Sequence, residues 1–214
     1  MDKRLLEIFS AISPCKSFAD IGCDHGYITE KMLKENKCDF AVISDVSKKC
    51  LNKAENLLRD YIESKRVQAF VSDGFDKLPL VDTALIAGMG GEEISKIILK
   101  AKNLPGTLVL QPMKNAEILR KTLIENNYFI EKDYIFKASS KFYVLIVAKK
   151  GAMKLTEEEL LFGKTNVMGK GKDFLEWANV EISKIEKYLD NKDLSTESKF
   201  RLESKKERLI KCIK

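Results

Sequence analysis

The 214-residue chain has few of the residues on which common metal and membrane sites depend. It has one histidine, His25, and five cysteines without a C-x-x-C pair, so no zinc site of ordinary spacing fits and we expect no metal. Scattered cysteines in odd number are typical of free thiols in a reducing compartment. No segment approaches the roughly 18 apolar residues of a membrane span, and the N-terminus lacks the apolar core of a secretory signal. We therefore expect a cytoplasmic protein without membrane association.

The rest of the composition is that of a folded, mildly basic protein. Hydrophobic residues make up 44% of the chain and charged residues 33%, which excludes wholesale disorder. Lys and Arg number 38 against 32 Asp and Glu, so the net charge is +6. This excess is compatible with a phosphate-rich partner, but many enzymes carry a similar charge without binding nucleic acid.

Short apolar runs alternate with amphipathic stretches over the first part of the chain, after an expected helix at residues 2–13. The expected strands are Ser17–Ile21, Phe40–Ser44, Val67–Val71, Thr83–Ala87 and Thr107–Leu110. The expected helices lie near residues 26–36, 47–64, 91–102 and 114–126. Strict alternation of strand and helix predicts an α/β fold with a parallel sheet wrapped by helices.

Residues 128–149 break this alternation, because they read as two strands joined by the turn Lys137–Ser140 with no room for a helix. Five parallel strands followed by an antiparallel hairpin form the outline of a class I methyltransferase sheet. A dinucleotide-binding dehydrogenase domain would continue with strand and helix instead. We therefore predict a Rossmann-like domain over residues 1–150.

The chain changes character after Gly151. The T-x-x-E spacing of Thr156 and Glu159 predicts a capping box at the start of a helix. Apolar residues then recur every three or four positions, as in a coiled-coil seam, at Leu175, Ala178, Ile182, Ile185 and Leu189. A polar break at residues 191–193 precedes a second helix. We predict that residues 151–214 form a separate helical domain, a coiled-coil-like antiparallel hairpin.

Polar residues and glycines stand at the ends of the first three expected strands. The first strand runs into the turn Asp20–Gly26, whose glycines let backbone approach a ligand. At the end of the second strand, Asp45 either accepts both hydroxyls of a ribose or caps the helix that begins near Ser47. The third ends in Ser72–Gly74, where Asp73 either accepts from an adenine amino group or belongs to an ordinary turn.

The fourth and fifth strands end in Ala87–Gly91 and Gln111–Met113. Three glycines within four residues cost backbone entropy, so we expect something to come close to this backbone. In open α/β sheets, ligands bind in the crevice outside the carboxyl ends of the strands. Five suitable strand ends in succession therefore predict one ligand site.

The motifs at these strand ends, taken together, point to a family. ADIGCDHGYIT, SDG, IAGMGGEEI and LQPM, with the later FGK…FLEW segment and the helical pair, closely resemble the bacterial tRNA adenine-N1 methyltransferase family TrmK over nearly the whole chain. That family acts on the adenine at position 22 of tRNA. The resemblance implies S-adenosylmethionine (SAM) as cofactor, methyl transfer to N1, and a C-terminal domain that helps to hold tRNA. We expect the protein to act as a monomer.

The resemblance also implies roles for individual residues around the cofactor. Asp20, Gly22, Asp24 and His25 would cradle the methionine end of SAM. Asp45 would take the ribose, although the family usually has Glu there. Ser72, Asp73 and Gly74 would border the adenine, and Gly88, Met89, Gly90 and Gly91 would form the wall that faces the transferred methyl group.

The reaction needs no covalent enzyme intermediate, because N1 of neutral adenine has a lone pair, so positioning is the main task. We expect Asp24 to stabilise the methylated base or take its N6 proton. Tyr27 and Tyr143 either stack on the flipped adenine or serve as core aromatics. The rest of the expected substrate site comprises Gln111 and Pro112 at the base, and Arg4, Lys114, Lys170 and Lys172 at phosphates.

Two further positions, besides Asp45, depart from the family pattern. Met113 stands where the family commonly has the Asn of Q-P-N, and Val144 follows Tyr143 where the family often has Glu. Two alternatives therefore remain open. The helical pair can be a dimerisation element in a methyltransferase of another RNA, of proteins or of small molecules, or the chain can be a catalytically silent SAM-binding module.

Overall fold

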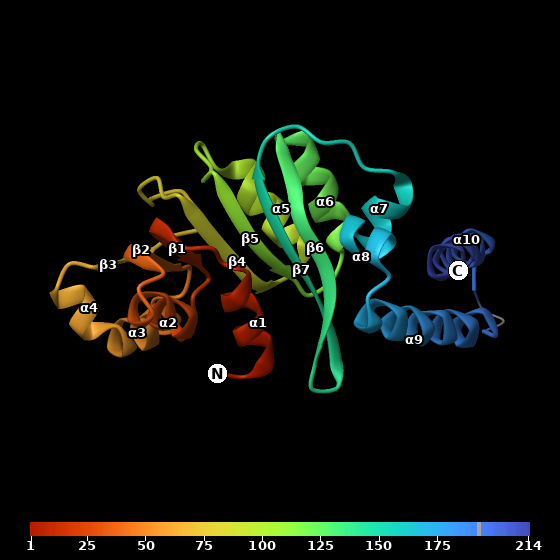
Figure 1. Cartoon of the computed structure of the whole chain (residues 1–214), viewed down its shortest axis with the longest axis horizontal. Coiled ribbons are helices and arrows are strands. Elements are labelled where there is room, and N and C mark those ends of the chain that lie inside the picture. Colours follow the sequence, from red (N-terminus) through yellow and green to blue (C-terminus); the bar gives the residue numbers. More distant parts are fainter. Residues whose placement is uncertain (192–193) are drawn as a thin grey trace.

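A seven-stranded mixed sheet forms the centre of the structure, a computed structural model that describes residues 1–191 and 194–214 (Figure 1). The strands, in chain order, are β1 (Cys15–Ile21), β2 (Cys38–Asp45), β3 (Val67–Val71), β4 (Thr83–Met89), β5 (Thr107–Pro112), β6 (Tyr128–Ala138) and β7 (Lys141–Lys150). Their order in the sheet is β3-β2-β1-β4-β5-β7-β6. The first five are parallel, and β7 is antiparallel to both β5 and β6. The five predicted strands and the terminal hairpin are confirmed.

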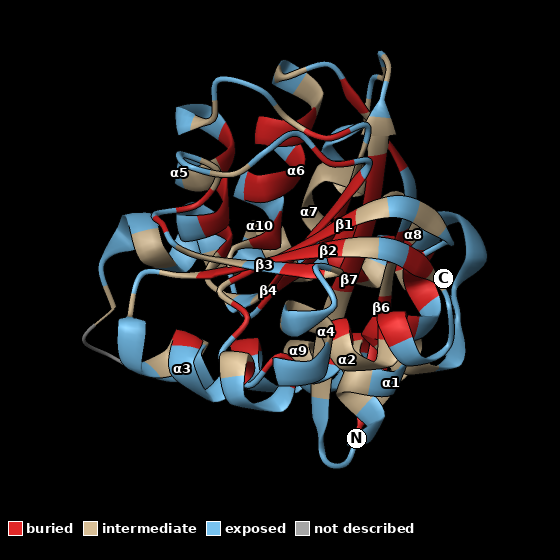
Figure 2. Ribbon diagram, turned by 90° about the vertical axis from the view of Figure 1, so that its left-hand side faces the viewer, coloured by how far each residue is buried: buried red, intermediate tan, exposed pale blue. Residues whose placement is uncertain are grey.

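Helices cover both faces of the sheet, because alternate residues of the buried strands point to opposite sides. In chain order they are α1 (Lys3–Ala11), α2 (Tyr27–Lys34), α3 (Lys48–Leu57), α4 (Arg59–Glu63), α5 (Gly91–Lys100) and α6 (Ala116–Glu125). Apolar residues of α1, α2 and α3 pack on one face and those of α5 and α6 on the other (Figure 2). The stretch predicted as one helix over 47–64 is divided at Leu58, which is fully buried.

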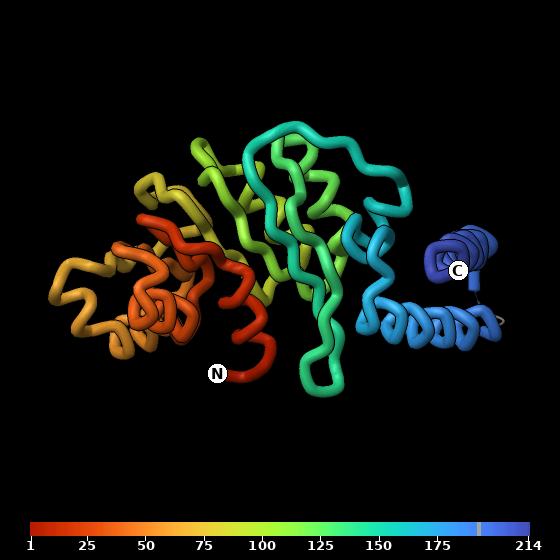
Figure 3. The backbone as a smooth tube through the Cα atoms, in the orientation of Figure 1, coloured from red at the N-terminus to blue at the C-terminus, as the bar shows by residue number. Residues whose placement is uncertain are grey.

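Four helices follow the sheet, namely α7 (Glu157–Phe162), α8 (Lys164–Gly169), α9 (Lys172–Leu189) and α10 (Thr196–Ile213). The segment 151–156 leaves β7 and passes the edge strand β6 to reach α7 (Figure 3). The predicted capping box is present, since Thr156 Oγ1 accepts from the Glu159 amide at 3.2 Å and the Glu159 carboxylate accepts from the Thr156 amide at 2.8 Å. Residues of α7, α9 and α10 share an apolar core with Ile135 of β6, so the helical region packs on the hairpin.

A buried ion pair fastens this region to the sheet. Arg120 of α6 donates two hydrogen bonds to the Asp133 carboxylate of β6, at 2.7 and 3.0 Å. The same guanidinium donates to the carbonyls of Leu160 and Leu161, at 3.0 and 3.1 Å, near the end of α7. A Cβ at Gly163 would lie 2.7 Å from an Asp133 carboxylate oxygen, so only glycine fits beside the pair. The sheet, α6 and α7 are thus joined through one guanidinium.

The predicted pair of C-terminal helices is present, but α9 and α10 cross instead of running alongside each other. Glu181 and Glu186 of α9 lie 3.0 and 3.8 Å from the adjacent residues Lys205 and Lys206 of α10. In an antiparallel hairpin the two partners would be spaced along α10 as they are along α9. Figure 1 agrees, because α9 lies across the view while α10 is seen end-on. The buried residues of α10 lie in its last turns, which explains the crossing, and the predicted break at 191–193 falls partly outside the described residues.

Candidate functional site

Two adjoining cavities lie over the carboxyl ends of β1, β2 and β4, and Gly22, Asp45 and Met89 line both. The larger has a volume of about 420 Å³ and extends over the loop after β1 to α1; we call it the loop lobe. The smaller, of about 250 Å³, extends to the end of β3 and to α5; we call it the β3 lobe. Because the order of strands reverses between β1 and β4, this groove lies at the topological switch point, where open α/β sheets bind ligands.

The loop between β1 and α2 depends on two glycines with positive φ. Gly22 has φ +71°, and a Cβ there would lie 2.2 Å from Met89 Cε of β4. Gly26 has φ +74°, and a Cβ there would lie 3.0 Å from the Ala54 Cβ of α3. Gly22 therefore keeps the floor of the groove open between the two lobes, whereas Gly26 packs the loop on α3.

Asp20, at the end of β1, is a buried carboxyl group in the lining of the loop lobe. Burial raises its pKa to about 7; the hydrogen bond donated by the Thr29 hydroxyl at 3.0 Å lowers it by less, and Asp45 raises it further. Such a group is half-ionised at neutral pH. A cationic ligand group in the lobe would favour its charged form, so the lobe suits a ligand that carries positive charge.

The rim of the loop lobe carries Asp24, His25 and Tyr27. Asp24 is exposed, has φ +44°, and accepts a hydrogen bond from Lys53 Nζ at 3.0 Å. His25 stacks on Tyr27 with ring centroids 5.3 Å apart and an interplanar angle of 5°. The rim therefore presents a carboxylate and an exposed aromatic pair beside the groove. Lys53, which holds the carboxylate, lies on α3 and was not predicted.

Asp45, the predicted ribose ligand, takes part both in the turn after β2 and in the lining of the groove. Its Oδ1 accepts from the Ser47 amide at 2.8 Å, and Ser47 caps α3, so the turn after β2 uses this carboxylate. Asp45 also lines both lobes of the groove. Asp45 is therefore not the cap of α3, which corrects that alternative, and its role at the ribose stays a prediction.

The end of β3 borders the β3 lobe, as predicted, through Ser72, Asp73 and Gly74. Ser72 is buried, and its hydroxyl donates a hydrogen bond to the Gly74 carbonyl at 3.3 Å. Asp73 is exposed and forms an ion pair with Lys100 of α5 at 2.9 Å, a partner that the sequence did not reveal. A Cβ at Gly74 would lie 2.7 Å from Ile97 Cγ2, so this glycine lets the turn lie against α5.

The four predicted residues after β4 divide into two pairs. Gly88, with φ +81°, lines the loop lobe and Met89 lines both lobes. Gly90 and Gly91 are outside the lining of either lobe, so their place in the wall stays a prediction. A Cβ at Gly91 would lie 2.1 Å from the Asn115 carbonyl oxygen, and the Gly91 amide donates to the Lys114 carbonyl at 2.8 Å. Gly91 is needed because the turns after β4 and β5 pack backbone to backbone.

Arg4 of α1 belongs to the wall of the loop lobe. Its Nη1 donates to Gln111 Oε1 at 2.8 Å, and its guanidinium lies 5.9 Å from the centre of the Tyr143 ring. Gln111 in turn donates to the Pro112 carbonyl at 3.0 Å. Arg4 was predicted as a phosphate ligand, and in the structure it is half-buried and fixes the predicted substrate residue Gln111. Tyr143 lies on the far side of this wall.

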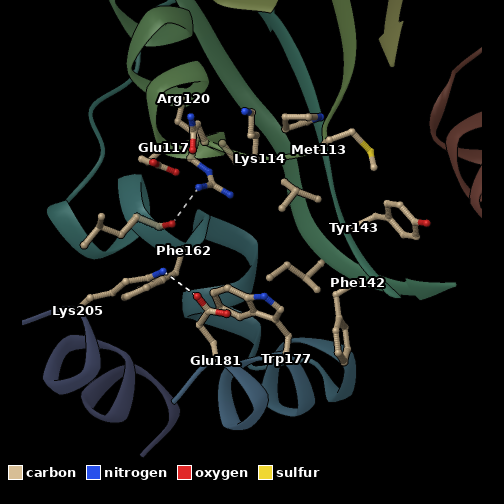
Figure 4. A pocket seen from close by; sticks show the side chains of 16 residues that line it. Met113, Lys114, Glu117, Arg120, Phe142, Tyr143, Phe162, Trp177, Glu181 and Lys205 are labelled. Carbon is tan, nitrogen blue, oxygen red and sulfur yellow. Dashed lines mark hydrogen bonds and ion pairs between the residues drawn. The ribbon is translucent and has the colours of Figure 1, made fainter. Parts of the chain in front are cut away.

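A further cavity of about 400 Å³ lies at the far side of that wall, between Met113, Lys114 and Tyr143 on one side and Trp177 and Glu181 of α9 on the other (Figure 4). We call it the α9 cavity. Sequence patterns missed it because its walls come from α6, β7, α9 and α10, which are distant in the chain. Its lining includes Met113 and Val144, two of the three departures from the family pattern. Lys170 and Lys172, also predicted as substrate ligands, are exposed at the start of α9 and line neither the groove nor this cavity.

The described part of the chain lacks two kinds of feature. None of its helices is both long and apolar enough to cross a bilayer. Within the same residues, no three or more His, Cys, Asp or Glu side chains are grouped to hold a metal ion.

Similarity to known proteins identifies the class of protein to which this chain belongs. Residues 1–146 match the family model described as a methyltransferase domain. A Mycoplasma pneumoniae protein, provisionally named a tRNA methyltransferase, is 34% identical over 155 residues, covering 69% of this chain and 71% of its own. A Mycoplasma genitalium protein with the same provisional name is 33% identical over 186 residues, covering 82% of this chain and 83% of its own. The chain belongs to the methyltransferase domain family.

Solved structures show the same fold over the full length. The M. capricolum TrmK in complex with S-adenosylhomocysteine (SAH) has a TM-score of 0.90 and 23% identity, covering 100% of this chain and 97% of its own. The B. subtilis m1A22 tRNA methyltransferase TrmK has a TM-score of 0.90 and 23% identity, covering 100% and 99%. The chain therefore shares its fold with both TrmK structures over its whole length.

Proposed function

We propose that this protein transfers the methyl group of SAM to N1 of the adenine at position 22 of tRNA. The observation that carries the proposal is the groove at the switch point, with the buried Asp20 carboxyl facing a cavity that Gly22 keeps open. The mycoplasma relatives named as tRNA methyltransferases and the TrmK structures that share this fold support it. We further propose that the protein acts as a monomer in the cytoplasm, and that residues 1–150 and 151–214 are its two domains.

The two adjoining lobes, of about 420 and 250 Å³, together fall within the roughly 300–1,000 Å³ of small-molecule sites, and the charges of the groove fit SAM. SAM supplies a methyl group activated by a sulfonium cation. The loop lobe, with Asp20, Asp24 and His25, would take its charged methionine end, because carboxylates stabilise the ammonium group there. The β3 lobe would take the adenosine, with Asp45 at the ribose and the Ser72–Gly74 turn at the adenine.

The remaining task of the protein is to position the target base. N1 of adenine bonds to the methyl carbon as the carbon–sulfur bond breaks, and the electron pair of that bond goes to sulfur. The wall made by Gly88, Met89 and Arg4 would hold the base in line, with Gln111 kept rigid by Arg4. Tyr27 would stack on the base that leaves the RNA, since its ring is exposed at the rim. Asp24, on the same rim, would stabilise the cationic product or accept its N6 proton.

The departures from the family pattern bear on the silent-module alternative. Met113 and Val144 line the α9 cavity and neither lines the groove. The third departure, Asp45, lines the groove but keeps a carboxylate there. The groove itself keeps its carboxyl groups and open glycines, so we favour an active enzyme. Phosphate contacts would come from Lys114, Lys170 and Lys172, all exposed. Methyl transfer from labelled SAM to unmodified tRNA tests the proposal.

Binding of SAM is expected to weaken below neutral pH because of Asp20. Its pKa of about 7 means that the carboxyl is largely protonated at pH 6, and a neutral carboxyl cannot pair with the ammonium group of SAM. Affinity should therefore rise as pH increases toward 7, by up to about tenfold per pH unit. Calorimetric titration of SAH, which carries the same ammonium group, from pH 5.5 to 7.5 would measure this. Asp20→Asn should bind more weakly with a flat profile; an equally steep profile in that variant would assign the titration to another group.

Removal of the rim carboxylate is expected to slow turnover. Asp24→Ala should lower kcat at saturating SAM by roughly a hundredfold, the lower end of the range for proton-transfer groups. Glu35→Ala is the matched control, because Glu35 is an exposed carboxylate at the end of α2 and is outside the groove. Full turnover by Asp24→Ala would remove Asp24 from the mechanism.

A further inference from the structure

We propose that the α9 cavity binds a second nucleobase of the RNA, from the nucleotide next to the target adenine. The proposal rests on the proposed function and adds a contact with the same substrate. It assigns a specific role to the helical region, namely to hold one base by stacking beside the reaction site.

The cavity has the size and lining of a site for a flat aromatic ligand. Its volume of about 400 Å³ lies within the roughly 300–1,000 Å³ of small-molecule sites. Trp177, Phe142 and Tyr143 line it, and all three are half-buried (Figure 4). Every nucleobase has a π-face, so aromatic side chains in a cavity stack bases without strict sequence preference.

Two buried phenylalanines, Phe162 and Phe174, hold the Trp177 ring in place. This ring stacks on Phe174 with centroids 5.8 Å apart at 25°, and lies 6.4 Å from Phe162 in a tilted arrangement. Phe162 and Phe174 are almost fully buried, so the indole rests on a fixed apolar layer while still lining the cavity. An aromatic surface fixed in this way loses little conformational entropy when a base stacks on it.

The cavity and the loop lobe are separated by a single wall. Arg4 lines the loop lobe, Tyr143 lines the α9 cavity, and the Arg4 guanidinium lies 5.9 Å from the centre of the Tyr143 ring. Lys114 lines the cavity next to the turn that follows Met89, which lines both lobes of the groove: its Cε would be 3.4 Å from a Cβ at Gly90. Lys114 forms no ion pair with the described residues. With the target base in the groove and its neighbour in the α9 cavity, the phosphate that connects the two nucleotides would lie near the Lys114 ammonium group.

The polar groups of the cavity indicate which edge of a base it recognises. Glu117 of α6 and Glu181 of α9 both line the cavity, and Lys205 pairs with Glu181 at 3.0 Å. Carboxylates accept hydrogen bonds from exocyclic amino groups. The cavity should therefore prefer adenine, guanine or cytosine to uracil.

Trp177 is the sole tryptophan of the chain, so its fluorescence reports on the cavity directly. Unmodified tRNA, titrated into the full-length protein with saturating SAH, should quench this fluorescence, because a stacked base quenches indole emission. Tyr188→Ala serves as the matched control, since Tyr188 is an exposed aromatic on the same helix and lies outside the cavity. This control should be quenched as wild type is. Saturable RNA binding that leaves the fluorescence unchanged would overturn the proposal.

Kinetics provide the second test. Trp177→Ala and Phe142→Ala should each raise KM for tRNA about five- to a hundredfold with little change in kcat. Trp177→Phe, which keeps an aromatic ring on Phe174, should recover most of the loss and guards against a folding defect in the alanine variant. Two tRNAs, one with an abasic site directly 5′ of the target and one directly 3′ of it, are compared. One of them should show a raised KM with wild type, and that tRNA should show little further rise with Trp177→Ala.

The outcomes separate this inference from the proposed function. Normal methylation of tRNA by wild type, with unchanged KM in Trp177→Ala and Phe142→Ala, would overturn the second-base site and leave the enzyme assignment intact. Additive effects of the abasic site and Trp177→Ala would also overturn it. Failure of wild type to bind or methylate tRNA at all would refute the proposed function and this site with it.

Discussion

Asp133→Ala is expected to lower the free energy of unfolding by about 3–5 kcal/mol, because it leaves the Arg120 guanidinium buried without its partner. Both side chains are almost fully buried, and the pair has two hydrogen bonds of 2.7 and 3.0 Å. For a chain of this length, each kcal/mol lowers Tm by roughly 2–4 °C. Thermal unfolding followed by circular dichroism should therefore show a fall in Tm of roughly 6–20 °C.

Two controls define the cause of that loss. Glu197→Ala removes the exposed ion pair between Glu197 and Arg201 on α10 and should change stability by less than about 0.5 kcal/mol. The double variant Arg120→Met with Asp133→Leu removes both charges and should be more stable than Asp133→Ala alone. If the double variant were the least stable of the three, the isolated charge would not be the cause.

Gly91→Ala is expected to disrupt both folding and turnover, although Gly91 is outside the groove. The new methyl group would lie 2.1 Å from the Asn115 carbonyl oxygen and 2.9 Å from that of Lys114, both of them backbone atoms. The turns after β4 and β5 must then separate, at a cost of about 1–3 kcal/mol or more. Because Met89 and Gln111 precede these turns, we expect kcat to fall at least about tenfold as well.

Gly90→Ala is the matched control, one residue away. Its Cβ would lie 3.4 Å from Lys114 Cε, the far end of a flexible side chain, and the φ of −69° suits any residue. Denaturant unfolding and steady-state kinetics should show Gly90→Ala close to wild type. Equal damage from the two substitutions would mean that both glycines serve the cofactor wall, as the sequence alone suggested.

The sheet was predictable from the sequence because its signals are local. Strands such as Val67–Val71 are short apolar runs bounded by polar turns, and the capping box at Thr156 is a four-residue pattern. The groove was predictable for the same reason, since parallel strands bring their carboxyl ends to one edge of the sheet. Asp20, Asp45 and Ser72 therefore meet at the groove as their positions in the chain indicate.

Features that depend on distant pairing were not predictable. Gly91 is a glycine because of the Asn115 carbonyl, and Arg4 is fixed by Gln111, 107 residues away. The crossing of α9 and α10 follows from which residues of α10 are buried against α7 and α9, and helical periodicity does not specify this. The α9 cavity has the same origin, because Trp177 lines it only once the helical region packs on the hairpin.

The most direct test of the central claim is methyl transfer from labelled SAM to unmodified tRNA, followed by nucleoside analysis of the digested product. The account predicts label in 1-methyladenosine, with its loss when the adenine at position 22 is replaced. Measurable SAM binding without label in any base would contradict it and would indicate another methyl acceptor or a silent module.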